Sequence, residues 1–263
     1  MADDDANLVQ YSCADRIATI TLNRPDKLNA VSDEVVAQLA EALRRFDLDE
    51  AAEVAIINGK GRAFSSGADV RQRQLRSRDE FEKLGGPQGW GTNSADLLTR
   101  SVNWKPVIAA VHGLCAGGAF YFINEADIII CSEDAQFFDP HVSFGLVPAC
   151  EPVGASHRMP YGEIMRMILM GNGERIGAET ALRINLVSEV VENAKLADRA
   201  HELAALIASR PSTATQGAVR AMWESLDLPY SAALRCSYKY TQVGNPVSRL
   251  DRSTAKKEPF TVR

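Results

Sequence analysis

Short apolar runs recur through the first two thirds of the chain at the lengths that strands require. IATITL at 17–22 alternates apolar and polar positions, as a strand buried on one face does. VAIING at 54–59, PVIAAVHG at 106–113 and ADIIICS at 126–132 are continuous apolar runs, which is the pattern of strands covered on both faces. AQFF at 135–138 is expected to form one more strand. These runs predict a set of mostly buried strands.

Amphipathic stretches lie between these strands and then occupy the C-terminal third. From Ser32 onward, apolar side chains recur at helical spacing on one face, namely those of Val35, Val36, Leu39, Leu43 and Phe46. Further helices are expected near Gly118 and over 161–171, 196–210, 212–226 and about 230–241. Strands that alternate with helices and are followed by helices alone predict an α/β protein with a helical C-terminal part.

Composition narrows the range of partners. The 263 residues are 46% hydrophobic, and 29 basic against 34 acidic side chains give a net charge of −5 without a basic stripe, so nucleic acid is not an expected partner. The run ADIIIC is far too short to cross a bilayer, and the acidic start MADDDAN is unlike a targeting peptide. Five cysteines without metal-type spacing indicate reduced thiols. We therefore expect a cytoplasmic protein without a membrane partner or a metal.

Two glycine-containing turns are the first candidate for chemistry. SSGAD at 65–69 and CAGGAF at 115–120 each follow a buried strand, and their small residues allow close approach to backbone N–H groups. Two such groups converging on one point would form an oxyanion hole, in which each donor contributes about 3–4 kcal/mol to transition-state stabilisation. Neither turn has a phosphate-binding glycine pattern, and the chain lacks the G-x-S-x-G elbow of serine hydrolases.

Five ordered sequence blocks carry a resemblance to a known family. ITLNRPDKLNA, GRAFSSGADV, KPVIAAVHGLCAGGAF, ADIIICSEDAQF and GLVP occur in the order and spacing of the crotonase superfamily, which is also called the enoyl-CoA hydratase/isomerase family. The match extends from about residue 8 to 210. The resemblance implies a crotonase-like spiral of ββα units over 1–200, and a C-terminal helical region with a basic tail over 201–263 that mediates homotrimers, often paired into hexamers.

The same resemblance implies an acyl-CoA substrate, with coenzyme A as part of the thioester and no separate cofactor. The amides of Ala68 and Gly118 correspond to the two oxyanion-hole donors. The residues implied to contact coenzyme A are Arg24, Lys27, Asn29, Ala30, Ser66, Asp69, Arg71 and Lys257. The pocket for the acyl group is expected to lie between the irregular segment 72–98 and the C-terminal helices. Chemistry at the α or β carbon of a thioester passes through an enolate, and fixed N–H dipoles stabilise the developing oxyanion more than the ground state.

The chain departs from the family pattern at both catalytic carboxylates. Tyr121 and His141 occupy the two positions where a family hydratase has glutamates, and Glu151 follows ten residues after His141. An imidazole exchanges protons near neutral pH, so we expect His141 to be the acid/base group, with Glu151 and Tyr121 as further catalytic candidates. The alternatives are a backbone-bonded histidine, a surface glutamate and a packing tyrosine. Asp139 is interpreted as a turn or capping residue.

Three functions remain open at this point. The first is an enoyl-CoA hydratase/isomerase-type enzyme with His141 in place of the glutamate pair. The second is a C–C hydrolase or decarboxylase of the same superfamily, because related β-diketone hydrolases resemble the D-P-H and G-L-V-P segments. The third is a non-catalytic acyl-CoA-binding subunit. The sequence does not define the acyl group, its length or the exact reaction.

Overall fold

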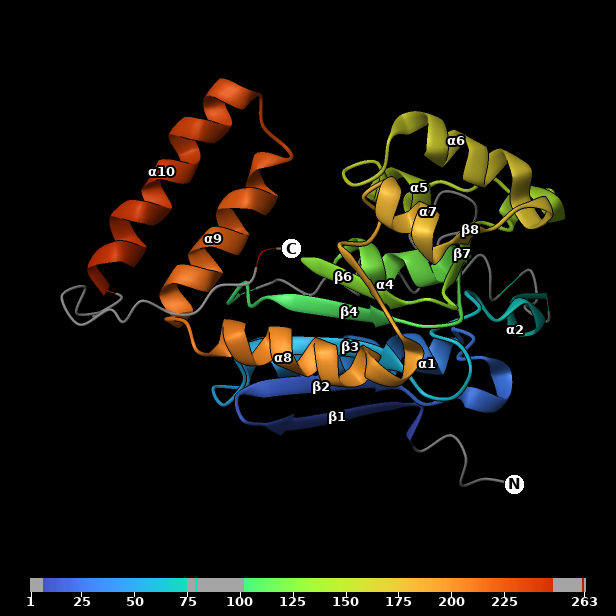
Figure 1. Cartoon of the computed structure of the whole chain (residues 1–263), viewed down its shortest axis with the longest axis horizontal. Helices are drawn as coiled ribbons and strands as arrows, with labels where there is room; N and C mark the ends of the chain where they lie inside the picture. Colours follow the sequence, from blue (N-terminus) through green and yellow to red (C-terminus); the bar gives the residue numbers. More distant parts are fainter. Residues whose placement is uncertain (1–6, 75–78, 80–101, 248–261, 263) are drawn as a thin grey trace.

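The computed structural model describes residues 7–74, 79, 102–247 and 262 (Figure 1). Its main sheet has six strands in the order β1-β2-β3-β4-β6-β9, with β1 antiparallel to β2 and the other neighbours parallel. Their bounds are Val9–Ala14, Ile17–Leu22, Val54–Gly59, Val107–Val111, Ile128–Ser132 and Glu189–Val191. A small second sheet has the order β5-β7-β8, with bounds Leu114–Ala116, Gln136–Phe138 and Ile176–Gly177.

Helices follow most of the strands. The α-helices are α1 (Asp33–Leu48), α2 (Val70–Gln74), α4 (Phe120–Asn124), α5 (Cys150–Ala155), α6 (Tyr161–Met170), α7 (Ala178–Arg183), α8 (Leu196–Ala208), α9 (Ser212–Ser225) and α10 (Tyr230–Val247). The single-turn 3₁₀ helices are η2 (Pro25–Lys27), η5 (Gly117–Ala119), η6 (His141–Phe144), η7 (Gly171–Gly173) and η8 (Asn193–Lys195). The described chain is therefore a mixed α/β structure that ends in helices, as the sequence predicts.

The main sheet is buried on both faces, which explains the continuous apolar runs of its strands. On one face, α8 lies across the strands (Figure 1) and presents small residues at four-residue spacing, so that its backbone approaches the sheet closely. The opposite face is covered by α1 and by the elements around the small sheet. Pairing registers align Ile20, Ile57, Ala109 and Ile129 on that opposite face. The expected division of the chain at residue 200 falls within α8.

Helix α1 illustrates how the local sequence specifies an element. Ser32 is its N-cap, and its hydroxyl oxygen accepts a hydrogen bond from the Val35 amide at 3.3 Å. Leu39 and Phe46 are fully buried on the apolar face, and burial of such a side chain stabilises the fold by about 1.5–3 kcal/mol. The start and the buried face of this helix match the sequence prediction.

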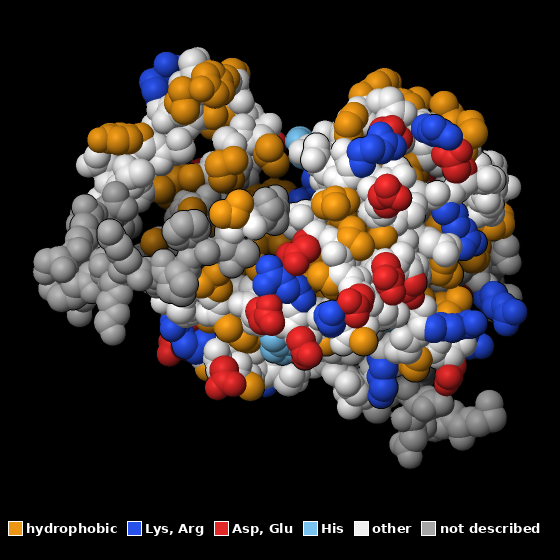
Figure 2. All heavy atoms as spheres, in the orientation of Figure 1, with side chains coloured by type: hydrophobic (Ala, Val, Ile, Leu, Met, Phe, Trp, Pro, Cys, Tyr) orange, Lys and Arg blue, Asp and Glu red, His pale blue; other side chains and the backbone are white. Residues whose placement is uncertain are grey.

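Helices α9 and α10 pack against each other beside the main body (Figure 1). Many of their apolar side chains face solvent, and orange patches cover much of this arm in Figure 2. The exposed members are Met222, Leu226, Leu228, Tyr230, Leu234, Tyr238 and Val243. Within the described ranges, no helix is long and apolar enough to cross a membrane.

Several elements escape the sequence patterns. The strands β1, β5 and β8 and the helices α2 and α5 were not expected, whereas the predicted strands and helices are confirmed, with α10 ending six residues beyond its predicted end at 241. Most of segment 72–98, including Trp90, lies outside the described residues, as does Lys257. The five cysteines are all free, as the sequence indicated.

Candidate active site

The two glycine-containing turns lie side by side. Ser65 and Cys115 form a parallel bridge, in which the Ser65 amide donates to Leu114 O at 2.9 Å and the Ala116 amide donates to Ser65 O at 3.1 Å. A Cβ placed on Gly118 would be only 3.3 Å from the Ala68 nitrogen. The structure therefore brings the backbones of the two predicted oxyanion-hole residues into direct proximity.

Only glycine permits this approach at two of the turn positions. Gly67 has a φ of +83°, and a Cβ there would be 2.4 Å from Ala116 O and 3.1 Å from the Gly118 nitrogen. Gly117 also has a positive φ, of +46°. In the described chain, the backbone hydrogen bonds that join separate elements do not use the amide of Ala68 or Gly118. Both amides are therefore candidates for binding a ligand.

Ala68 and Gly118 lie on the wall of a pocket with a volume of about 820 Å³. Its apolar side includes Phe144 and Leu146, both more than half exposed, and its charged side includes Lys27 and Arg71, both exposed. Arg24, Ala30, Ser66, Asp69 and His141 also line it. Most of the predicted coenzyme A contacts and the predicted oxyanion-hole residues therefore border one cavity.

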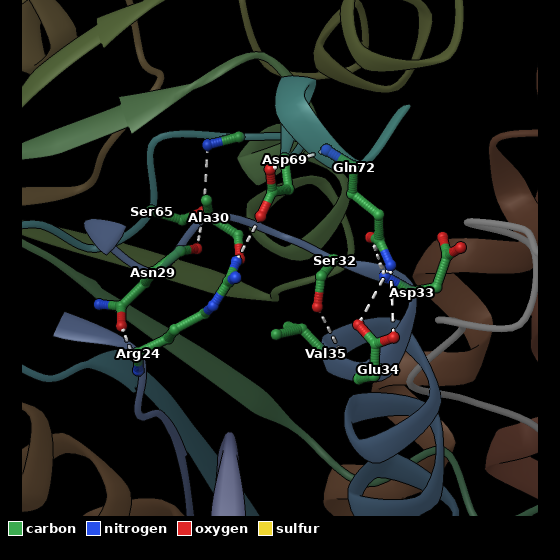
Figure 3. Close-up of polar contacts among 11 residues, drawn as sticks. Arg24, Asn29, Ala30, Ser32, Asp33, Glu34, Val35, Ser65, Asp69 and Gln72 are labelled. Atoms are coloured by element: carbon green, nitrogen blue, oxygen red, sulfur yellow. Dashed lines mark hydrogen bonds and ion pairs between the residues drawn. The ribbon is translucent and has the colours of Figure 1, made fainter. Parts of the chain in front are cut away.

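Asn29 has a different position from these lining residues. Its side chain is 1% exposed, and its oxygen accepts a hydrogen bond from the Arg24 amide at 2.8 Å while its nitrogen donates to Lys60 O and Ala63 O. Its backbone oxygen accepts from the Ser65 hydroxyl at 2.8 Å (Figure 3). Asn29 thus links the 24–30 turn to the first glycine-containing turn by hydrogen bonds.

An ion pair joins the same turn to α2. Figure 3 shows the Arg24 guanidinium pointing at Asp69, with 2.6 Å between its nitrogen and the carboxylate oxygen, and Arg24 also donates to Ala30 O at 3.1 Å. The hydrogen bond from Arg24 lowers the pKa of Asp69. Gln72 extends the connection to α1, because its side-chain oxygen accepts from the Asp33 amide at 2.9 Å. The charged side of the pocket is therefore held by contacts among three segments.

His141 begins η6 directly beside the second glycine turn. A Cβ on Gly117 would lie 3.5 Å from its ring Cε1 atom and 3.2 Å from Pro140 Cδ. The imidazole Nδ1 is 2.7 Å from Asp139 Oδ1, and the same oxygen accepts the His141 backbone amide at 2.9 Å. The side chain is 17% exposed, toward the pocket. The candidate acid/base residue therefore lies at the edge of the cavity that Ala68 and Gly118 border.

Glu151 lies on the other side of the imidazole, with its Oε1 3.7 Å from Nε2. It is in the first turn of α5 and its side chain is 7% exposed, so it is a buried carboxylate rather than a surface charge. Its backbone oxygen accepts from the Asn124 side chain at 2.9 Å. Tyr121, in contrast, is half-buried on α4 and packs against the core, and it is not among the pocket-lining residues.

Asp139, His141 and Glu151 also have the donor atoms of a metal site, all within 4.8 Å of one another. The 2.7 Å contact, however, places Asp139 on the Nδ1 edge of the ring, which leaves His141 Nε2 and Glu151 as the two facing donors. Structural zinc sites have four protein ligands and catalytic sites commonly three. Among the described residues, His141 Nε2 and Glu151 Oε1 are thus two facing donors, fewer than the protein ligands of such a zinc site.

The comparisons with known proteins define the family of this chain. The model of the enoyl-CoA hydratase/isomerase family matches residues 13–243, and the chain belongs to that family. It is 35% identical over 225 residues to a probable enoyl-CoA hydratase of Rhizobium meliloti, covering 84% of this chain and 82% of that protein. It is 33% identical over 201 residues to the 1,2-epoxyphenylacetyl-CoA isomerase of Escherichia coli, covering 74% of each chain.

A solved structure of a relative supports the same family. The crystal structure of an enoyl-CoA hydratase/isomerase from Mycobacterium paratuberculosis superposes with a TM-score of 0.79 at 34% identity, covering 94% of this chain and 92% of that one. The fold is thus the crotonase fold that the sequence resemblance implied.

The sequence predicted most of the pocket residues but not the contact between Asp139 and the His141 imidazole. An aspartate before a proline and a 3₁₀ turn looks like a capping residue, and it does accept the His141 amide. The complete burial of Asp139 and its contact with the imidazole depend on how η6 orients the His141 ring toward Asp139. The two-residue spacing in the sequence alone does not show this orientation. The only sequence signal was an aspartate two positions before the histidine.

Proposed function

We propose that this protein is an acyl-CoA-processing enzyme that stabilises a thioester enolate with the amides of Ala68 and Gly118 and exchanges protons through His141. The observation that carries the proposal is the placement of both amides and the imidazole on one pocket. Family membership supports acyl-CoA as the substrate class. A preorganised pair of donors contributes most where the negative charge develops, which is the carbonyl oxygen of the enolate.

The reaction that these groups support best is transfer of a proton between the α and γ carbons of an enoyl thioester. His141 removes the α proton, the electron pair moves onto the thioester oxygen, and the two amides stabilise the resulting oxyanion. The protonated imidazole then returns that proton to the γ carbon, so the double bond moves from the 3 to the 2 position. One base is sufficient for this reaction, whereas addition of water normally uses the two carboxylates that this chain lacks at the family positions.

The charged side of the pocket is proposed to bind coenzyme A. Lys27 and Arg71 are exposed cations on the pocket wall and are suited to phosphate groups. Arg24 is already paired with Asp69, so we assign it to holding the turn rather than to neutralising a phosphate. The apolar residues Phe144 and Leu146 are proposed to face the acyl chain.

Replacement of His141 tests the proposal directly. His141→Gln is expected to lower kcat for conversion of 3-enoyl-CoA to 2-enoyl-CoA by about 10²–10⁴-fold, because the general acid/base is lost while the amides remain. The matched control is His201→Gln, since His201 is exposed on α8 and its ring Nδ1 lies 2.9 Å from the Ala197 carbonyl oxygen, within its own helix.

Equal turnover by wild type and His141→Gln would contradict the catalytic role of His141. Cleavage of a CoA-free β-diketone would instead favour the C–C hydrolase alternative. Tight binding of acyl-CoA without turnover of any thioester would favour the non-catalytic alternative. Crotonyl-CoA hydration is measured in parallel and is expected to be weak.

A further inference from the structure

Asp139 is a fully buried carboxylate attached to the candidate acid/base residue. It follows β7 directly, and its exposed fraction is 0%. One of its oxygens, Oδ1, accepts a hydrogen bond from the His141 backbone amide at 2.9 Å and lies 2.7 Å from the imidazole Nδ1. The other oxygen, Oδ2, is buried and has no hydrogen-bond partner. Burial of a carboxylate costs free energy unless its contacts compensate. The two contacts of Oδ1 therefore indicate a specific role for Asp139.

We propose that Asp139 is a positioning residue that keeps the imidazole proton on Nδ1 of His141 and so makes Nε2 the atom that exchanges protons. An ionised carboxylate only accepts hydrogen bonds, so the ring nitrogen facing it must carry a proton. In neutral imidazole the other nitrogen then has the free electron pair. This inference rests on the proposed function, because it assigns a role within the same reaction.

The backbone fixes the geometry that this role requires. Because Oδ1 also accepts the amide of His141 itself, the carboxylate is tied to the same residue whose ring it orients. The ring also lies beside the second glycine-containing turn, where a Cβ added to Gly117 would be 3.5 Å from Cε1. A flip of the ring would give up the contact between Nδ1 and Asp139, so this contact fixes which nitrogen is left to exchange protons.

Glu151 completes the arrangement on the opposite edge of the ring. At 3.7 Å its carboxylate is too far from Nε2 for a hydrogen bond, but close enough to stabilise the imidazolium that forms when Nε2 takes a proton. A space between the two atoms is also needed if Nε2 is to reach a substrate carbon. The imidazole lies between the two buried carboxylates, Asp139 and Glu151, and becomes positively charged only after proton transfer. The two carboxylates therefore stabilise the imidazolium intermediate.

The test combines spectroscopy with kinetics on the full-length protein. In ¹⁵N-histidine-labelled wild type without substrate, long-range imidazole correlations are expected to show His141 in the Nδ1–H form. Asp139→Asn keeps an oxygen for the His141 amide but removes the charge, and it is expected to lower kcat on the order of 10²-fold with KM nearly unchanged. Asp227→Asn, in the exposed link between α9 and α10, is the matched control and is expected to keep wild-type turnover.

The outcomes separate this inference from the proposed function. An Nε2–H form in wild type, or full kcat in Asp139→Asn, would overturn the role of Asp139 even if His141→Gln is inactive. Full turnover by His141→Gln would overturn both. If Asp139→Asn does not fold, the ¹⁵N spectrum of the wild type still decides the tautomer. Stoichiometric zinc in the purified protein, bound through His141, would also overturn the inference, because Nε2 would then be a metal ligand.

Discussion

One added methyl group at Gly118 would narrow the gap between the two turns, where we propose that a thioester oxygen binds. A Cβ on Gly118 would be 3.3 Å from the Ala68 nitrogen, so even one methyl group would enter the space that the oxygen is proposed to occupy. The φ of Gly118 is not in the left-handed region, so alanine does not strain the backbone there. This position therefore separates catalytic loss from unfolding.

Gly118→Ala is expected to lower kcat/KM for the enoyl thioester by about 10²-fold, the cost of obstructing one oxyanion donor. Gly162→Ala on α6 is the control, because a Cβ at that position has no neighbour within 4 Å. Steady-state kinetics together with thermal unfolding measure both effects. Unchanged kinetics in a folded Gly118→Ala protein would argue against an oxyanion at this point.

The chemistry of individual residues was only partly predictable from the sequence. The two glycine-containing turns could be recognised from the sequence, because small residues directly after a buried strand indicate a turn whose backbone can be approached closely. Glu151 is ten residues from His141, and its approach to 3.7 Å depends on α5, whose sequence CEPVGA contains a proline and a glycine. Proline is tolerated in the first turn of a helix, where no intrahelical hydrogen bond is lost. A helix of six residues is, in addition, too short to show a periodic pattern in the sequence.

At the scale of elements, Glu224 ties α9 to α10. Its carboxylate accepts hydrogen bonds from Arg220 at 2.8 Å and Lys239 at 3.1 Å, and also from the Tyr240 hydroxyl. These bonds, that from Tyr240 first, lower the pKa of Glu224 to about 2 from its ordinary value of 4.5. Because the pKa is lowered by folding, the stabilisation is complete above about pH 4.5 and is lost as the pH falls toward 2.

Glu224→Gln is therefore expected to be less stable than wild type at neutral pH, by on the order of 1 kcal/mol once solvent screening is allowed for. The difference should shrink as the pH falls through the same window, because the wild-type carboxylate then becomes neutral as well. Urea unfolding at several pH values measures it, with the exposed Glu50→Gln as control. A difference that stays constant with pH would contradict the account.

Most of the predicted elements have a long apolar pattern and most of the missed ones are short, although β1 has six residues and was not predicted. Helices α1 and α8 and the strands β2, β3 and β4 carry clear patterns, because each buries a continuous face. The strand β5 has three residues and β8 has two, too few to show any period. Their positions are set by pairing with β7, which is a tertiary contact that a local pattern cannot contain.

At the scale of the whole molecule, the α9–α10 arm leaves an apolar surface without cover from the described part of the chain. Met222, Tyr238 and Val243 are each more than 60% exposed. Contiguous exposed apolar patches mark interaction sites in soluble proteins. We propose that copies of this chain cover the surface by forming the trimer that the family resemblance implied.

Light scattering on the purified protein is expected to give a mass three or six times the 28.7 kDa of one chain. Met222→Asp is expected to shift the population to smaller species, because it places a charge in the apolar surface. Leu206→Asp, at a similarly exposed leucine on α8, is the comparison. A wild-type protein that is monomeric at micromolar concentration would contradict the proposed assembly.

The carbonyl stretching frequency of a bound thioester tests most directly whether the amides of Ala68 and Gly118 converge on its oxygen. Isotope-edited infrared spectra of a ¹³C=O-labelled enoyl-CoA would be compared free, bound to wild type and bound to Gly118→Ala. The account predicts that the band moves to lower frequency on binding to wild type, because two donors polarise the carbonyl, and that the substitution largely reverses this shift. A bound carbonyl with the same frequency as in water, in both proteins, would contradict it.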